Sequence, residues 1–100
     1  MSEKIKISRE SAFHYKGIDN YLELCKWVKM LDHRYIGEGI KSLRMLNHEN
    51  VVISKFDYDD DWVTEIVLTP GDWGVWGRES RYGIEAIRDG DFDKIFEFNE

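Results

Sequence analysis

Cysteine and proline are almost absent from this sequence, which contains only Cys25 and Pro70. A single thiol cannot form an intramolecular disulfide, and a chain without disulfides fits the reducing cytoplasm. Cys25 stands among apolar residues of an expected helix, so we expect a buried, unreactive thiol.

Long apolar runs are also absent from the sequence. No run approaches the about 20 residues that cross a membrane, and no charged-then-apolar leader opens the chain. We therefore expect a cytoplasmic protein that makes no membrane contact.

Positive charge is scarce in the second half of the chain. Residues 1–50 contain nine Lys or Arg and seven Asp or Glu, whereas residues 51–100 contain five and thirteen. The second half would repel nucleic acid, because phosphate binding needs clustered cations. Direct nucleic-acid binding is thus disfavoured, and a partner with a basic groove would be attracted. The alternative is a solvated acidic face that maintains solubility.

Catalytic signatures are missing as well. The sequence has no P-loop, no Gly-x-Gly-x-x-Gly and no Gly-x-Ser-x-Gly. Its three histidines, His14, His33 and His48, lack Cys or carboxylate partners at the spacing of a structural zinc site. We expect no enzymatic activity and no cofactor.

The acidic segment 57–61 invites a comparison with calcium-binding loops. Asp57, Asp59 and Asp61 have the i, i+2, i+4 spacing that opens an EF-hand loop. However, Trp62 and Leu68 occupy the positions of its obligatory glycine and bidentate glutamate. The segment therefore predicts a solvated loop and no metal site.

What is present suffices for one folded domain. The chain has 100 residues, of which 42% are hydrophobic and 14% aromatic. Two domains of half this length would each have a poor core, so we expect a single α+β domain over residues 1–100.

Periodicity and turn residues predict the elements. Helical spacing predicts one main helix over about 20–32, with Asn20 and Glu23 forming a capping box. Thr69 to Asp72 predicts a type II turn, in which Pro70 and Gly71 supply the two central conformations. Strands are expected at 4–8, 12–15, 51–56, 62–68, 73–76, 81–84 and 94–98.

Residues 33–49 and 85–93 have patterns that fit more than one structure. Residues 33–49 fit either a short helical turn or an irregular edge strand, followed by a turn at 47–50. Residues 85–93 fit a helical turn broken at Gly90. The predicted fold is a small antiparallel, strongly bent and partly open barrel-like sheet packed against one main helix.

Aromatic residues gather in the second half. Alternation along a strand places Trp73 and Trp76 on opposite faces, so one core face cannot take both. One reading exposes a tryptophan beside Arg78 or Arg81, because Trp, Tyr and Arg anchor interfaces. The other reading, which we favour, places one tryptophan in each of two packed layers.

Two blocks of sequence resemble a known family. Residues 12–20, followed by an amphipathic helix, are similar to the opening of small phage and prophage proteins of the PGDYG-motif family. Residues 70–74, with Trp73 in place of the motif tyrosine, then Gly77, Tyr82 and residues 92–96, resemble the rest of its pattern. Residues 82–87 differ from the family's Tyr-Pro-x-x-Pro link, and residues 33–49 are longer than in the family. The resemblance implies a small α+β domain of phage or prophage origin and carries over no catalytic residues.

These observations predict a protein-binding module, in the form of a phage accessory protein that binds a host or phage protein. A specific form is an inhibitor of a host defence or nucleic-acid-processing protein, whose basic groove would receive the acidic surface. The alternatives are a small-ligand or nucleotide pocket under Trp73 and Trp76, and self-association through an edge strand. The predicted partner-binding residues are Asp57, Tyr58, Asp59, Asp60, Asp61, Trp76, Arg78 and Arg81, and the predicted turn residues are Pro70, Gly71, Asp72 and Gly77.

Overall fold

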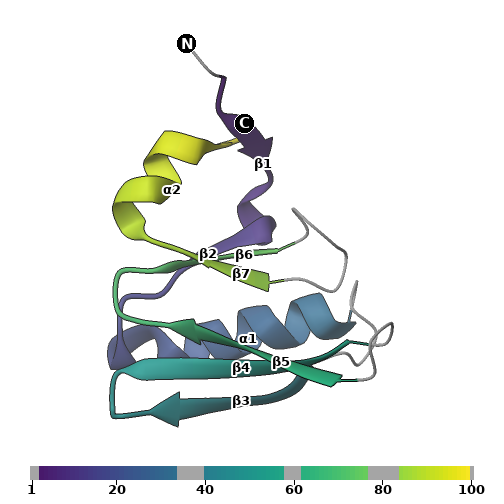
Figure 1. The fold of residues 1–100 in the computed structure, drawn as a ribbon. Helices are drawn as coiled ribbons and strands as arrows, with labels where there is room; N and C mark the ends of the chain where they lie inside the picture. The colour runs from purple at the N-terminus through teal and green to yellow at the C-terminus, as the bar shows by residue number, and fades with distance from the viewer. Residues whose placement is uncertain (1–2, 34–39, 58–61, 77–83, 100) are drawn as a thin grey trace.

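The fold is known from a computed structural model, which describes residues 3–33, 40–57, 62–76 and 84–99 (Figure 1). Within these ranges, one long helix and one short helix combine with eight strands and two single-turn 3-10 helices. In chain order the elements are β1 (Ile5–Ile7), η1 (Arg9–Ser11), β2 (Ala12–His14), η2 (Ile18–Asn20), α1 (Tyr21–Leu31), β3 (Ile40–Leu46), β4 (Asn50–Asp57), β5 (Trp62–Leu68), β6 (Trp73–Trp76), β7 (Ile84–Ile87), α2 (Asp89–Ile95) and β8 (Phe96–Phe98).

The strands form three small sheets, which confirms an α+β fold with one main helix. Two sheets are antiparallel, with the orders β3-β4-β5 and β2-β6-β7. The third differs from the expected antiparallel arrangement, because β1 pairs in parallel with β8. Parallel neighbours need a long connection, and nearly the whole chain separates these two strands.

The elements are stacked in layers, with α1 between the β3-β4-β5 sheet and the β2-β6-β7 sheet, and with α2 beyond the latter (Figure 1). The first hydrophobic cluster joins Leu24, Trp27, Val28 and Leu31 of α1 to the sheets on either side. These positions recur every three or four residues, which is the apolar stripe that predicted the helix. The remaining buried members of this cluster are Tyr15, Val51, Ile53, Leu68 and Ile84.

The β2-β6-β7 sheet is covered on both faces, which explains the placement of the two tryptophans. Trp76 packs against the first cluster, whereas Trp73 packs against a second cluster on the α2 side. The alternative with one tryptophan in each layer is therefore confirmed. The buried members of the second cluster are Ala12, Val75, Phe92 and Phe96.

The predicted capping box at the start of α1 is wrong. The side chain of Asn20 makes no cap hydrogen bond. Its Oδ1 accepts from the Lys16 amide at 2.9 Å, and its Nδ2 donates to the His14 carbonyl at 2.9 Å. Because η2 precedes α1, the Asn20 side chain faces back toward β2. It stabilises the connection between β2 and η2 instead of the start of α1.

Residues 40–46 form a strand, β3, which decides between the two readings of this region. β3 pairs with β4 at one edge of its sheet, and its register shifts between Ile40 and Ser42. The turn expected at 47–50 is confirmed, since Asn47 and His48 have φ values of 55° and 67°.

The region after β6 differs from the sequence prediction. Residues 84–87 form the strand β7, and α2 then runs from Asp89 to Ile95 with Gly90 inside it. The expected final strand shortens to β8, because Lys94 and Ile95 belong to the helix. Burial of Phe92 in the second cluster outweighs the cost of about 1 kcal/mol for a helical glycine.

Candidate functional site

The Pro70–Gly71 turn has the structural role that the sequence predicts. Gly71 has a φ of 99°, and the Asp72 amide donates to the Thr69 carbonyl at 2.9 Å, as a type II turn requires. The Asp72 carboxylate is buried and accepts from the Thr69 amide at 3.0 Å and from the Thr69 hydroxyl at 2.9 Å. The turn is tied to Tyr15 by two backbone hydrogen bonds of 2.8 and 2.9 Å.

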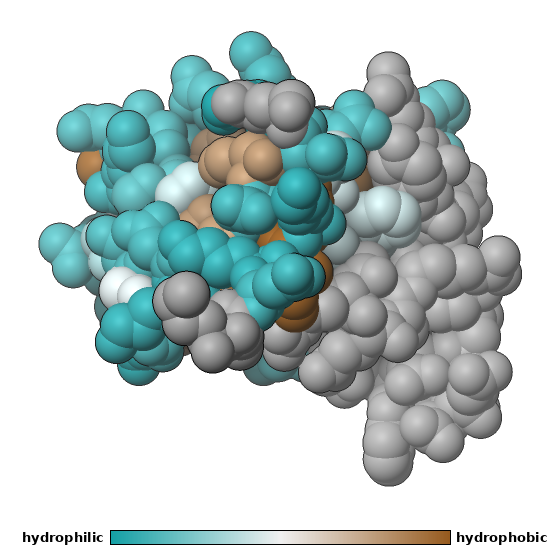
Figure 2. Space-filling view, turned by 90° about the horizontal axis from the view of Figure 1, so that it is seen from above, coloured by the Kyte–Doolittle hydropathy of each residue, from teal (hydrophilic) through white to brown (hydrophobic). Residues whose placement is uncertain are grey.

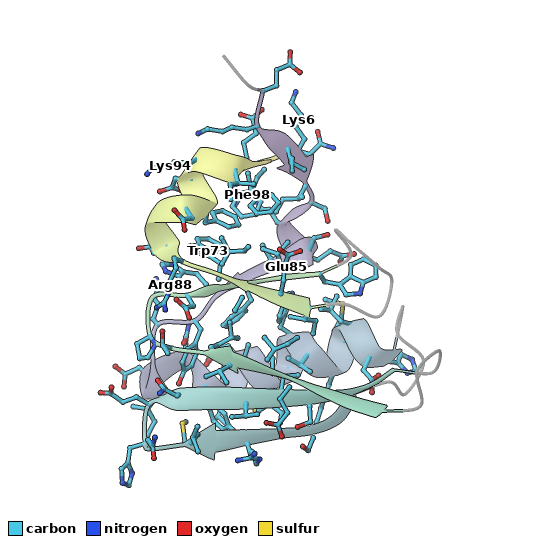
Figure 3. All side chains as sticks on the ribbon, viewed as in Figure 1. Lys6, Trp73, Glu85, Arg88, Lys94 and Phe98 are labelled. Atoms are coloured by element: carbon cyan, nitrogen blue, oxygen red, sulfur yellow. The ribbon has the colours of Figure 1, made fainter. Side chains whose placement is uncertain are left out.

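A stack of three aromatic rings joins this turn to α2. The His14 and Trp73 rings are parallel within 4° at a centroid distance of 4.4 Å, and Trp73 and Phe92 are parallel within 7° at 3.9 Å. Figure 3 shows Trp73 and Phe98 between α2, β1 and the β2-β6-β7 sheet, and their ring centroids are 6.1 Å apart. Strands β2 and β6 and helix α2 each supply one ring, so the stack fixes α2 against the sheet.

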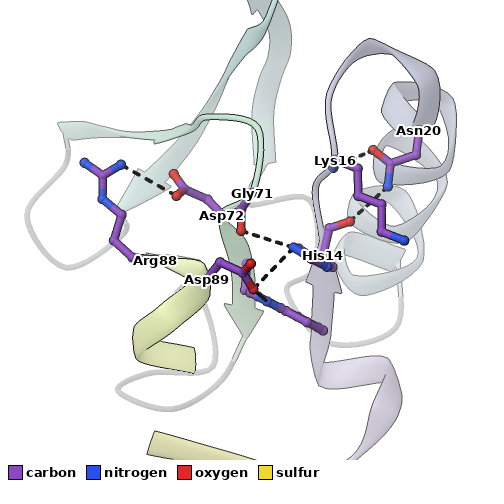
Figure 4. A network of polar contacts seen from close by, with 8 residues as sticks. His14, Lys16, Asn20, Gly71, Asp72, Arg88 and Asp89 are labelled. Atoms are coloured by element: carbon purple, nitrogen blue, oxygen red, sulfur yellow. Dashed lines mark hydrogen bonds and ion pairs between the residues drawn. The ribbon is translucent and has the colours of Figure 1, made fainter. Parts of the chain in front are cut away.

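Polar contacts surround the stack, as Figure 4 shows. Nε2 of His14 lies 3.2 Å from the Gly71 carbonyl oxygen and 3.6 Å from Oδ1 of Asp89. Because a carbonyl can only accept, Nε2 carries a hydrogen in this arrangement. Trp73 Nε1 donates to the same Asp89 oxygen at 3.1 Å. Arg88 completes the group with an ion pair to Asp72 at 3.8 Å.

The helix α2 and the strand β8, which these contacts hold in place, expose an acidic surface to solvent. Asp89, Asp91, Asp93 and Glu97 are all exposed. Figure 2 looks onto the end of the molecule that carries α2 and β1, and its described part is mostly hydrophilic. Residues 84–99 carry five carboxylates (Glu85, Asp89, Asp91, Asp93 and Glu97) against two cations (Arg88 and Lys94).

Sequence reasoning missed these α2 carboxylates as partner-binding candidates. A usable signal was present, because Phe92 and Ile95 have the i, i+3 spacing of a short apolar helical stripe. That signal is weak, because Gly90 disfavours a helix and the neighbouring residues 94–98 fit a strand pattern.

Most of the predicted partner-binding residues lie outside the described residues, namely Tyr58, Asp59, Asp60, Asp61, Arg78 and Arg81, as does the turn residue Gly77. Asp57 is the last residue of β4, where it pairs with Trp62. Trp76 is half-buried against the first cluster, so much of its ring serves the core.

A second candidate region lies between α1 and β3. A cleft of about 480 Å³ opens there, away from Trp73 and Trp76. Cys25 lines it and is half-buried, so the expected burial of this thiol is wrong. The lining residues are Leu22, Cys25, Val28, Lys29, Asp32, Ser42 and Leu43.

Two tyrosines near the first cluster stay neutral at physiological pH. Burial raises the pKa of the Tyr15 hydroxyl above 10.0, and the negative charge of Glu49 raises it further. Burial also raises the pKa of Tyr21, with smaller contributions from its hydrogen bond to Cys25 and from the Cys25 and Tyr15 charges. Neither hydroxyl is thereby activated as a base or nucleophile.

Within the described ranges, no group of three or more His, Cys, Asp or Glu side chains is placed to hold a metal ion. Of the helices in the described part of the chain, none combines the length and apolar character that a membrane crossing requires.

Comparison with protein-family models, curated proteins and solved structures finds no match to the chain.

Proposed function

We propose that this protein is a non-enzymatic protein-binding module that engages a basic surface of its partner. The observation that carries the proposal is the anchored acidic surface of α2. Its helix is held by the His14–Trp73–Phe92 stack, while Asp91 and Asp93 remain exposed to solvent. A rigid arrangement of charge lowers the entropy lost on binding, and complementary charge raises the association rate.

The proposed setting is that of a phage accessory protein acting in the host cytoplasm. It rests on the resemblance to the PGDYG-motif family and on the charge balance of the second half. In its specific form, the protein inhibits a host defence or nucleic-acid-processing protein by occupying a groove that otherwise receives phosphates. The acidic segment 57–61, predicted from the sequence, is the other candidate for this contact.

Affinity capture from the native host, combined with matched charge variants, tests this function. The double variant Asp91→Asn/Asp93→Asn removes two exposed carboxylates from α2. The control Asp19→Asn/Glu23→Asn removes two exposed carboxylates from η2 and α1, so the net charge changes equally. We expect the α2 variant to lose the captured protein at low salt, and the control to retain it.

A third variant, Asp59→Asn/Asp60→Asn/Asp61→Asn, tests the loop predicted from sequence. Retention of the same partner by every variant would refute an acidic binding surface. If the α2 variant and its control lose the captured protein equally, the loss follows from the change in net charge alone. That result would refute the assignment of binding to α2.

A further inference from the structure

The cleft between α1 and β3 is built like a small-molecule site. Its volume of about 480 Å³ lies within the range of ~300–1,000 Å³ typical of ligand pockets. Leu22, Val28 and Leu43 supply apolar wall on both sides, and Lys29 and Ser42 add a cation and a hydroxyl. Such a lining matches a ligand that is mostly apolar and carries one polar end.

We propose that this cleft binds a small amphiphile with an apolar body and an anionic head group, of the monocarboxylate class. The apolar body would cover Leu22, a residue that is 70% exposed without a ligand. Covering exposed apolar surface is favourable. The head group would lie at Lys29, with the Ser42 hydroxyl as a hydrogen-bond donor from the opposite wall.

Charge at the rim favours an anionic head. Lys29 is exposed, and no ion pair within the described residues includes it. Asp32 is the other charged lining residue, but it is half-buried and already has a polar partner. The net charge of −6 repels anions at long range. At physiological salt, screening limits this repulsion to about 8 Å. The nearby Lys29 ammonium therefore determines which head-group charge the cleft prefers.

The size of the apolar area favours a small molecule over a protein in this cleft. Among the described residues, the large exposed apolar side chains near the start of α1 are Ile18 and Leu22. Their neighbours Asp19, Glu23 and Lys26 are exposed and charged. A stable protein interface covers about 800 Å² of each partner and has an apolar centre, which two side chains do not provide.

A head-group series tests the proposal directly. Decanoate, decanol and decylammonium share one apolar body and differ in charge, and each is titrated below its micelle-forming concentration. We expect calorimetry to give the tightest binding for decanoate. Because Cys25 is the only thiol and lines the cleft, bound decanoate should also slow its reaction with a maleimide.

Two matched pairs of variants locate the site. Lys29→Gln should weaken decanoate binding about fivefold, whereas Lys26→Gln, on the same helix but outside the lining, should not change it. Leu22→Gln should weaken it about tenfold. Ile18→Gln removes a similarly exposed apolar side chain outside the cleft and should have no effect.

Several results would overturn the inference. Equal affinity for the three head groups would remove the role of Lys29, and tightest binding of decylammonium would assign the charge preference to Asp32. Equal losses within either pair of variants would place the ligand elsewhere. If protection of Cys25 from the maleimide increased with protein concentration and without decanoate, a second copy of the chain would be the occupant of the cleft. None of these results depends on the acidic surface of α2, so this inference and the proposed function fail separately.

Discussion

Tyr15, a buried member of the first cluster, links the turn between β3 and β4 to the Pro70–Gly71 turn. Its side chain is fully buried, and its hydroxyl donates to the backbone carbonyl of Glu49 in the turn between β3 and β4. Its backbone bonds Gly71 and Asp72 of the type II turn. Because water does not reach the ring, the hydroxyl depends on this single acceptor and the carbonyl gains a buried donor.

We predict that Tyr15→Phe lowers the free energy of unfolding by about 1 kcal/mol, since it removes the part-buried hydrogen bond to the Glu49 carbonyl. The variant also changes the response to alkali. The pKa of Tyr15 is raised above 10.0 in the folded state. Its contribution to stability is therefore complete below pH 10 and is lost as the pH rises through the folded-state value. Urea denaturation from about pH 9 to about pH 11 should show a shallower decline for Tyr15→Phe than for the parent. An equal decline in the two proteins would contradict the assignment.

Two glycines predict opposite effects of the same substitution. A Cβ at Gly74 would lie 3.1 Å from the Trp27 ring, a buried group that cannot move aside freely. A Cβ at Gly90 meets nothing within 4 Å and lies in a helix. We predict that Gly74→Ala costs about 1–3 kcal/mol and that Gly90→Ala stabilises the protein by about 0.5–1 kcal/mol. Thermal unfolding of both variants measures this, and a stabilising Gly74→Ala would show that the contact with Trp27 relaxes.

At the scale of elements, α2 is a short helix whose position depends on one buried ring. Phe92 stacks on Trp73 and also contacts Phe96 and Phe98 at centroid distances of 5.3 and 5.9 Å. A seven-residue helix that contains glycine is unstable alone. Its helical state therefore follows from tertiary packing.

We predict that Phe92→Ala costs about 3–5 kcal/mol and releases α2 from the sheet. Hydrogen exchange should then accelerate in residues 89–98 more than in α1. Asp93→Ala, an exposed change in the same helix, should leave exchange in β6 unchanged. Retained protection of α2 in Phe92→Ala would contradict the role of the stack.

The elements also show what sequence reasoning could reach. Helix α1 and the Pro70–Gly71 turn were predictable because their signals are local: a broad apolar stripe and a residue pair with fixed dihedral preferences. The sequence leaves β3 undecided because its pattern fits two periods. It predicts α2 only as a helical turn broken at Gly90, because the full helix depends on the stacking of Phe92 on Trp73, a partner remote from its own segment. The parallel pairing of β1 with β8 and the α1–β3 cleft have no local signal, since each joins distant segments.

At the scale of the whole molecule, two clusters share the β2-β6-β7 sheet as a common wall. The first cluster surrounds α1, and the second is completed by α2, β1 and β8. The two outermost strands of the sequence thus close the same cluster, and Ile7 packs against it. The acidic surface stands on this second cluster, so its geometry depends on both ends of the chain.

We predict that deleting residues 1–7, which removes β1, lowers hydrogen-exchange protection in β8 and α2 while α1 and β4 stay protected. The loss follows from uncovering Phe96 and Phe98, the register partners of Ile5 and Ile7. Deleting only residues 1–3 keeps β1 and serves as the control. A uniform loss of protection across α1 and β4 would instead show that the two clusters unfold as one unit.

The pairing of β1 with β8 also sets an order of events during translation. β1 is synthesised before α1, but its neighbour β8 follows α2, whereas α1 can meet β4 and β5 before α2 has been synthesised. Contacts so distant in sequence form slowly, so Ile5 and Ile7 await their cover on the nascent chain. The surface that we assign to the partner is accordingly expected to mature after the first cluster has formed around α1.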